Sequence, residues 1–289
     1  VGELGCIETP VVLTNTLNVP LVADAVMEYV LNMEGNQRVF SVNPVVGETN
    51  DGGLNDIRNR HVKKEHVFEA IKNATTGPVE EGCVGAGTGT SCLGFKGGIG
   101  TSSRVLPQRR GGYTVGVLVQ TNFGGNLTIN GAPVGREMNK FYMNRDIPYD
   151  VDGSCMIVIA TDAPVSPRNL KRMAKRVSHA MGRVGGTGSN GSGDYVIAFS
   201  TYEKNRVKYF TRERVKAIDD LQNDHMSPLF MAVIEAAEEA ILNSMFMAET
   251  ITGNNNRTLE AIPIKETLEV LKKYNALKWN EKIPPWSDK

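Results

Sequence analysis

The chain of 289 residues is long enough for one large domain or two small ones, and it can bury a core without disulfide staples. Its 32 basic and 32 acidic residues balance, so it carries no general electrostatic attraction to nucleic acid or to an anionic membrane. No stretch approaches the roughly 18 apolar residues of a spanning helix, no signal peptide opens the chain, and the four cysteines form no C-x-x-C pair. We therefore expect a cytoplasmic protein with reduced cysteines, no membrane association and no nucleic-acid partner.

The N-terminal part opens with a strand followed by a helix. Hydrophobic spacing predicts a strand at 9–14, a helix at 20–33, a second strand at 39–46 and a short helix at 65–74. The polar, glycine-bearing segment 47–56 is predicted to be a loop that either turns the chain or carries function.

The richest glycine segment, residues 82–103, invites comparison with a phosphate-binding loop. It contains neither G-x-x-x-x-G-K-[ST] nor a well-placed G-x-G-x-x-G, because Lys96 precedes Gly97 and Gly98 instead of following the loop glycine. We expect these glycines to let backbones approach closely around a pocket or between packed sheets.

The middle of the chain continues with strands. A strand is predicted at 113–122, and a hairpin at 126–134 around the Asn130-Gly131 turn. Further on, an Asp-Gly turn ending at Gly153 leads directly into an apolar run that begins with Ser154. This pattern predicts a buried strand with a serine at its mouth.

The C-terminal part is mainly helical. Ser166 as cap and Pro167 at the first helical position predict a helix start, and its basic residues fit a solvated side better than a nucleic-acid stripe in a neutral chain. Three more elements follow in the sequence: a strand at 195–200 after the glycine and serine loop 185–194, a long helix at 227–248 and a last helix at 265–274.

The catalytic motifs that the chain lacks limit its chemistry. The four histidines form no H-E-x-x-H motif, so we predict no metal site and no cofactor, and no G-x-S-x-G elbow or Ser, His and Asp set occurs. A serine can work without histidine if it becomes the first residue of a new chain, because its α-amine, with a pKa of about 8, then lies beside its hydroxyl. Ser154 is suited to this role, since Gly153 lacks the Cβ that would block attack on the preceding carbonyl.

Seven motifs that occur in order along the chain resemble those of the DmpA-type aminopeptidases, which include the β-peptidyl aminopeptidases. They are ETPVVLTNT at 8–16, VVGETNDGGLNDI at 45–57, GFKGGIGTSSR at 94–104, GGYTVGVLVQTNFG at 111–124, DGSCMIVIATDAP at 152–164, SNGSGDYVIAFST at 189–201 and SPLFMAVIEAAEEAILNS at 227–244. A single motif would mean little, but seven in register are specific.

The resemblance implies an α+β fold, a single four-layer αββα sandwich over 1–289 that resembles the N-terminal-nucleophile hydrolases but has a different connectivity. It also implies autocleavage between Gly153 and Ser154 into an α chain, 1–153, and a β chain, 154–289, and assembly of αβ units into a homo-oligomer. Family chains usually begin well upstream of the ETP motif, which leaves open that N-terminal strands of the sandwich lie outside this sequence.

The resemblance also assigns roles to individual residues. Ser154 would be the nucleophile, and Asn122 would supply an oxyanion-hole amide. Ser192 and Asp194 match the serine and acidic residue that hydrogen-bond around the nucleophile and its amine. Glu48 matches the acid that holds the substrate's ammonium.

Two of the matched positions depart from relatives. Asn50, a substrate-binding position, stands where a relative carries a tyrosine, which puts any tyrosine-dependent stabilisation or selectivity in doubt. Asp194 is shorter than the glutamate of some relatives. An alternative role for Asn122 and Ser192 is the capping of loop backbone.

The sequence therefore predicts a self-processing serine aminopeptidase that releases N-terminal residues from short peptides, amino-acid amides or esters through an acyl-enzyme. One alternative is an acyltransferase of the ornithine acetyltransferase type, which Ser154 disfavours because that nucleophile is a threonine. Another is a nonenzymatic glycine-loop protein that binds a ligand and never cleaves. The sequence does not indicate whether the substrate is L-, D- or β-configured.

Overall fold

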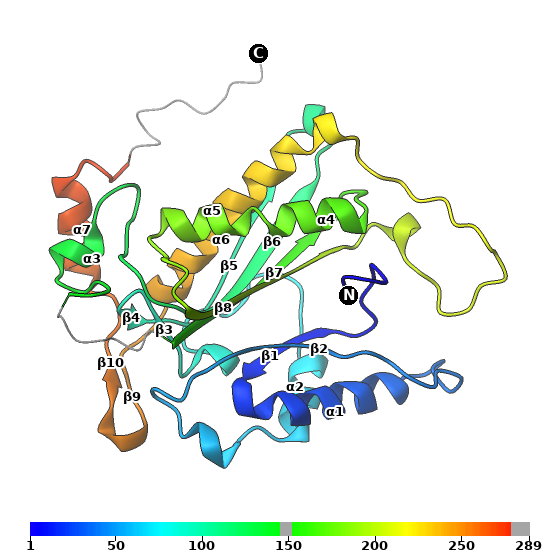
Figure 1. Cartoon of the computed structure of the whole chain (residues 1–289), viewed down its shortest axis with the longest axis horizontal. Coiled ribbons are helices and arrows are strands. Elements are labelled where there is room, and N and C mark those ends of the chain that lie inside the picture. Colours follow the sequence, from blue (N-terminus) through cyan, green and yellow to red (C-terminus); the bar gives the residue numbers. More distant parts are fainter. Residues whose placement is uncertain (145–151, 279–289) are drawn as a thin grey trace.

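The computed structural model describes residues 1–144 and 152–278, and its elements form four layers (Figure 1). A central antiparallel sheet with one parallel edge pair has the strand order β5-β6-β7-β8. Its strands are β5 (Ile99–Val105), β6 (Thr114–Asn122), β7 (Asp152–Thr161) and β8 (Gly191–Ser200). A second, parallel sheet consists of β1 (Val11–Asn15) and β2 (Val45–Thr49).

Helices cover the outer face of each sheet (Figure 1). On one side, α6 packs on β5 and β6, α4 packs on β8, and α5 packs on α6; on the other, α1 packs on β1 and β2 and contacts α2. Their bounds are α1 Val19–Leu31, α2 Lys64–Lys72, α4 Pro167–Ala174, α5 Val177–Arg183 and α6 Ser227–Phe246. Because β2 also packs on β7, the order of layers is helix, sheet, sheet, helix, which confirms the predicted αββα class.

The described part of the chain also contains smaller strands and helices. They are the hairpins β3 (Ser91–Cys92) with β4 (Phe95–Lys96) and β9 (Ile251–Thr252) with β10 (Thr258–Leu259), the short helix α3 (Val134–Glu137) and α7 (Ile264–Lys273). Helices α3 and α7 pack against each other. In the described residues, no helix has both the length and the apolar character needed to cross a membrane.

The main core lies between α6 and the central sheet. The buried face of α6 is rich in alanine, and this allows the helix backbone to approach the sheet closely. A Cβ placed on Gly100 of β5 would lie 1.9 Å from the Ala240 carbonyl oxygen of α6, so only glycine fits there. Close backbone approach at a glycine of the 82–103 segment is therefore confirmed, although the partner of Gly100 is a helix and not a second sheet.

Several predicted boundaries were wrong. Residues 39–44 are not a strand; β2 covers Val45–Thr49 instead and takes three residues from the predicted loop 47–56. Gly47 faces β7, where a Cβ would meet the Met156 side chain at 2.5 Å, and pairing with β1 completes the strand. Similarly, β8 begins at Gly191, inside the predicted loop 185–194, because its parallel pairing with β7 extends that far.

Two other predicted elements differ from the structure: a hairpin is shorter and a turn is replaced by strand. The hairpin at 126–134 is reduced to one bridge between Ile129 and Ala132, although Asn130 and Gly131 do have positive φ, 49° and 81°. The turn predicted at Gly153 is absent, since β7 begins at Asp152 and places Ser154 inside the strand.

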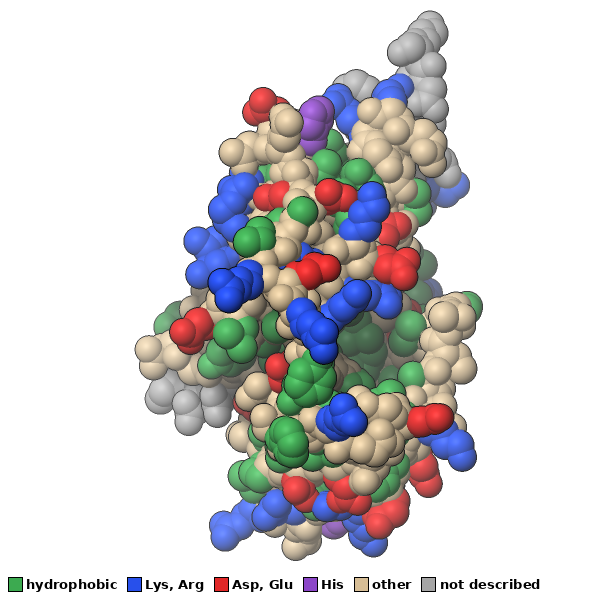
Figure 2. Space-filling model, turned by 90° about the vertical axis from the view of Figure 1, so that its right-hand side faces the viewer, with side chains coloured by type: hydrophobic (Ala, Val, Ile, Leu, Met, Phe, Trp, Pro, Cys, Tyr) green, Lys and Arg blue, Asp and Glu red, His purple; other side chains and the backbone are tan. Residues whose placement is uncertain are grey.

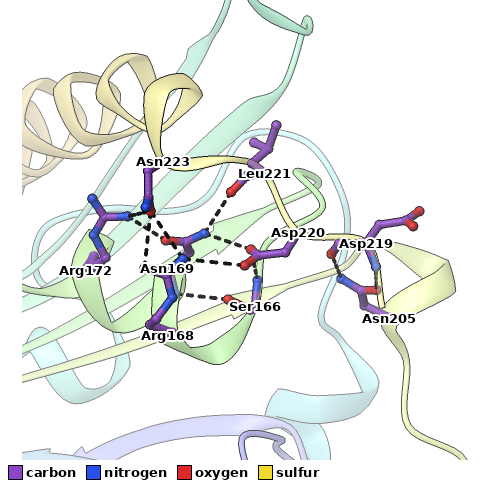
Figure 3. Close-up of polar contacts among 9 residues, drawn as sticks. All are labelled: Ser166, Arg168, Asn169, Arg172, Asn205, Asp219, Asp220, Leu221 and Asn223. Atoms are coloured by element: carbon purple, nitrogen blue, oxygen red, sulfur yellow. Dashed lines mark hydrogen bonds and ion pairs between the residues drawn. The ribbon is translucent and has the colours of Figure 1, made fainter. Parts of the chain in front are cut away.

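The helix predicted from Ser166 starts as expected, with the Ser166 hydroxyl accepting from the Asn169 amide, but it is divided into α4 and α5. The side chain of Asn169 is completely buried and donates to Asp220 and to the Leu221 carbonyl, which ties α4 to the segment before α6 (Figure 3). Arg172 donates to Asn223 in the same network.

Two of the arginines predicted for this helix, Arg172 in α4 and Arg176 just after it, are partly buried, whereas Arg168, Lys171 and Lys175 are exposed. The guanidinium groups of Arg172 and Arg176 also lie 4.9 and 4.1 Å from the ring centroid of Phe230. On the face drawn in Figure 2, Lys and Arg side chains are interspersed with Asp and Glu, so that this face is not uniformly basic.

Candidate active site

Ser154 lies near the start of β7, an inner strand of the central sheet, in register with Asn122 at the end of β6 on one side and Gly193 of β8 on the other. The residue is 8% exposed, and its hydroxyl oxygen is buried without a hydrogen-bond partner among the described residues. An unpaired buried hydroxyl is unfavourable and requires an explanation, which a reactive role supplies. The neighbouring Cys155 is a poor nucleophile, because burial raises the pKa of its thiol well above the usual range.

The side chain of Asn122 is held at both ends. Its Oδ1 accepts from the Ser91 backbone amide at 3.1 Å, and its Nδ2 donates to the Asn50 carbonyl at 2.8 Å. The Ser91 N–H fixes the orientation of the carboxamide, since a donor must face the oxygen. Nδ2 carries two hydrogens, so one N–H remains for an oxyanion in the same sheet row as Ser154.

Ser192 and Asp194 follow on β8 and form a pair. The Ser192 hydroxyl donates to the Asp194 carboxylate at 3.1 Å. Burial raises the pKa of Asp194, and the hydrogen bond from Ser192 only partly offsets this effect. The Ser192 Oγ also lies 3.3 Å from the position that a Cβ on Gly153 would occupy, so the hydroxyl adjoins Gly153. The register pairs Ser192 with Gly153 and Asp194 with Cys155, which places both side chains on the face of the sheet opposite to the Ser154 side chain.

Of the predicted substrate-binding residues, Glu48 lies outside this row. Side chains alternate along β2: Gly47 faces Met156, whereas Val46 packs into the cluster around α1. Glu48 is therefore on the α1 side, where its carboxylate accepts a hydrogen bond from Thr16. It is two residues from Asn50 in the sequence, and its side chain does not enter the Ser154 row.

Asn50 reaches the site through its backbone, because its carbonyl holds Asn122 while its side-chain oxygen accepts from the Gly52 amide. The next residue, Asp51, is 7% exposed and accepts from Asn15 and Asn55 at 3.3 and 3.0 Å. It lines a cavity of about 700 Å³ between β1, α2 and the glycine segment. Burial raises the pKa of the Asp51 carboxyl.

Sequence reasoning named Asn50 only as a substrate-binding residue, and it missed Ser91 and the support that both residues give to Asn122. Ser91 and the Asn50 carbonyl contribute backbone groups, which leave no signal in side-chain types. Asp51 was also not predicted, and its place within the resembling motif at 45–57 is the one sequence signal that could have indicated it.

Within 1–144 and 152–278, no three His, Cys, Asp or Glu side chains gather closely enough to hold a metal ion.

The model of peptidase family S58 matches residues 1–259. The chain belongs to peptidase family S58. This membership makes it a hydrolase and confirms the resemblance to the DmpA-type aminopeptidases. The β-peptidyl aminopeptidase BapA of Sphingosinicella microcystinivorans is 44% identical, over 95% of this chain and 72% of that protein.

Several solved structures resemble this chain closely. The PH0078 protein of Pyrococcus horikoshii OT3 has a TM-score of 0.85 and 46% identity, covering 95% of this chain and 75% of that one. The L-aminopeptidase D-Ala-esterase/amidase of Ochrobactrum anthropi has a TM-score of 0.83 and 35% identity, covering 92% and 73%. The latter is described as a prototype for the serine aminopeptidases and a variant of the Ntn-hydrolase fold.

Proposed function

We propose that this S58 hydrolase is a self-processing serine aminopeptidase that is cut between Gly153 and Ser154 into an α chain, 1–153, and a β chain, 154–289. The setting of Ser154 carries the proposal. Its hydroxyl is buried and unpaired among the described residues, the preceding Gly153 adjoins Ser192, and Ser154 is in register with Asn122, whose side-chain amide is fixed.

Self-cleavage needs only groups that lie close together in the uncut chain. The Ser154 hydroxyl attacks the Gly153 carbonyl carbon, the C–N bond breaks, and the proton of the hydroxyl passes to the departing amine. Water then hydrolyses the resulting ester, leaving a Gly153 carboxylate and a free Ser154 α-amine. The Ser192–Asp194 pair adjoins the Gly153 side of this bond, where the Ser192 oxygen can accept a hydrogen bond while its own proton is held by Asp194.

Peptide hydrolysis reuses the same serine. The new α-amine, with a pKa of about 8, takes the hydroxyl proton as Ser154 attacks the substrate carbonyl. The free N–H of Asn122 stabilises the oxyanion, an interaction typically worth about 3–4 kcal/mol. The amine product leaves, and water resolves the acyl-enzyme.

An aminopeptidase must also bind the substrate's free ammonium. Glu48 is the proposed carboxylate, since it is half-buried and its carboxylate is already oriented by Thr16. The names of the relatives support peptides with an N-terminal β-residue, amino-acid amides and esters as the substrates to test. We also propose that αβ units assemble into a homo-oligomer.

The activity is tested by incubating the purified chain with a dipeptide whose N-terminal residue is a β-amino acid, an L-amino-acid amide and D-alanine amide. Release of the N-terminal residue is followed by chromatography, with Ser154→Ala as the matched control. The proposal predicts release from at least one substrate by the wild type and none by the variant. Equal release by both would refute the nucleophile assignment, and a chain that binds these compounds without cleaving any would favour the nonenzymatic alternative.

The acyltransferase alternative is distinguished in the same assay. With an added amine acceptor, a transferase forms the acylated acceptor in preference to the free acid, whereas a hydrolase continues to form the free acid.

A further inference from the structure

Lys96, on β4, has a completely buried side chain. Its ammonium donates to two backbone carbonyls, that of Gly87 at 2.9 Å and that of Gly97 at 2.7 Å. Burial lowers the pKa of this ammonium. An ammonium group away from water is costly even when it is hydrogen-bonded, so its presence in the core requires a reason beyond packing.

The contacts of Lys96 close a small loop. In the β3–β4 hairpin, Lys96 is paired with Ser91. The Gly97 amide donates to the Thr90 carbonyl at 3.0 Å, and the Thr90 hydroxyl donates to the Gly87 carbonyl at 3.1 Å. Lys96 therefore links Gly87, the first residue of the segment 87–91, to β4, the strand that pairs with Ser91 at the end of that segment.

That segment presents the group that orients Asn122. The Ser91 amide, at its end, donates to the Asn122 Oδ1. A carboxamide turned by half a rotation would direct its NH₂ group at the Ser91 N–H and its oxygen at the Asn50 carbonyl, and both contacts would be repulsive. The correct orientation of Asn122 thus depends on where the Ser91 amide is held.

We propose that Lys96 is a positioning residue for the oxyanion amide: by clamping the loop from Gly87 to Gly97, it holds the Ser91 N–H that orients Asn122. Lys96 itself does not touch the reacting atoms. This inference rests on the proposed function of Asn122, and it predicts that loss of the ammonium lowers the rate of the chemical step without weakening substrate binding.

The test uses Lys96→Met, which keeps an unbranched side chain and removes the ammonium. A matched control is Asn169→Leu on α4, which replaces another completely buried polar side chain, one that contacts none of the loop residues in the described structure (Figure 3). Each variant is also combined with Asn122→Ala. Rates are referred to the concentration of processed enzyme, and hydrogen exchange of peptides covering 87–97 is measured by mass spectrometry.

The inference predicts that Lys96→Met lowers kcat by about tenfold with KM unchanged, against the loss of about 100-fold or more expected for Asn122→Ala. In the Asn122→Ala background, Lys96→Met should cause no further loss, because it acts only through that amide. Exchange at 87–97 should accelerate in Lys96→Met and remain unchanged in Asn169→Leu. A tenfold loss that persists in the Asn122→Ala background, or unchanged exchange in Lys96→Met, would overturn the inference.

Failure of the inference is separable from failure of the proposed function. A wild type that hydrolyses no substrate refutes the proposed function. The hydrogen-exchange rates alone then test whether Lys96 clamps the loop. Faster exchange at 87–97 in Lys96→Met supports the clamp, and unchanged exchange rejects it.

Discussion

The substitution Gly153→Ala should slow self-cleavage while changing the stability of the fold little. A Cβ at this position would lie 3.3 Å from the Ser192 Oγ, 3.3 Å from the Phe123 Cα and 3.4 Å from the Asn122 carbonyl oxygen. The latter two atoms are backbone, so the Ser192 hydroxyl is the group that yields, by a few tenths of an ångström. Because a misplacement of about 1 Å can cost about 100-fold in rate, we expect self-cleavage to slow by about three- to tenfold.

The stability of this variant should change little. Gly153 does not have a positive φ, and replacing such a glycine by alanine stabilises by about 0.4–1 kcal/mol through the unfolded chain, which offsets the tight contacts. The net change is therefore expected within about 1 kcal/mol, measured by urea unfolding. Gly116→Ala on β6 is the control, since its Cβ would enter open space.

The cleavage rate is measured by following intact mass after the uncut chain is refolded. Gly116→Ala should be cut at the wild-type rate and Gly153→Ala more slowly. If both variants are cut equally fast, the space around Gly153 has no part in the reaction. A destabilisation of several kcal/mol in Gly153→Ala would contradict the geometry.

Two further predictions concern carboxyl groups whose pKa is raised in the fold. Burial raises the pKa of the Asp194 carboxyl, which accepts the hydrogen bond from Ser192. Self-cleavage should therefore accelerate as the pH rises through that pKa and Asp194 loses its proton, and Asp194→Asn should lack this acceleration. The measurement is the rate of fragment formation from acid to neutral pH. The pKa of Asp51 is raised from 3.8 by burial, so the folded state binds the extra proton, and the stability contributed by this group is lost as pH rises through the folded pKa. The difference in unfolding free energy between wild type and Asp51→Asn should fall across that window, and a constant difference would show that the carboxyl does not titrate differently in the fold.

The elements that the sequence predicted well have long, unambiguous patterns. The α6 helix and strands β6 and β7 combine many apolar residues at regular spacing with clear boundaries, and the cap at Ser166 is a local signal. The layer order came from the family resemblance, because periodicity does not say which sheet a helix covers.

The errors occurred where tertiary contacts override local preference. Gly47 has a low strand propensity, yet it lies in β2 because it pairs with Leu13 of β1, and a larger residue there would clash with the Met156 side chain. Gly191 and Ser192 also look like loop residues, but pairing with β7 makes them strand. These contacts join segments far apart in the sequence, and no local pattern reports them.

The same limit applies to the site. The resemblance named Ser154, Asn122, Ser192 and Asp194, and their catalytic roles remain predictions. The sheet places Asn122 beside Ser154, whereas Ser192 and Asp194 lie beside Gly153 and Cys155. The groups that hold the Asn122 amide come from the backbone, and the only sequence pattern that includes Lys96 is a glycine segment that does not match a phosphate loop.

The most direct test is intact-protein mass spectrometry with N-terminal sequencing, on the wild type and on Ser154→Ala. Self-processing by Ser154 predicts two wild-type fragments, one beginning Ser154-Cys155-Met156, and a single uncut chain for the variant. A wild type that remains whole under native conditions, or a variant that is cut at the same bond, would contradict it.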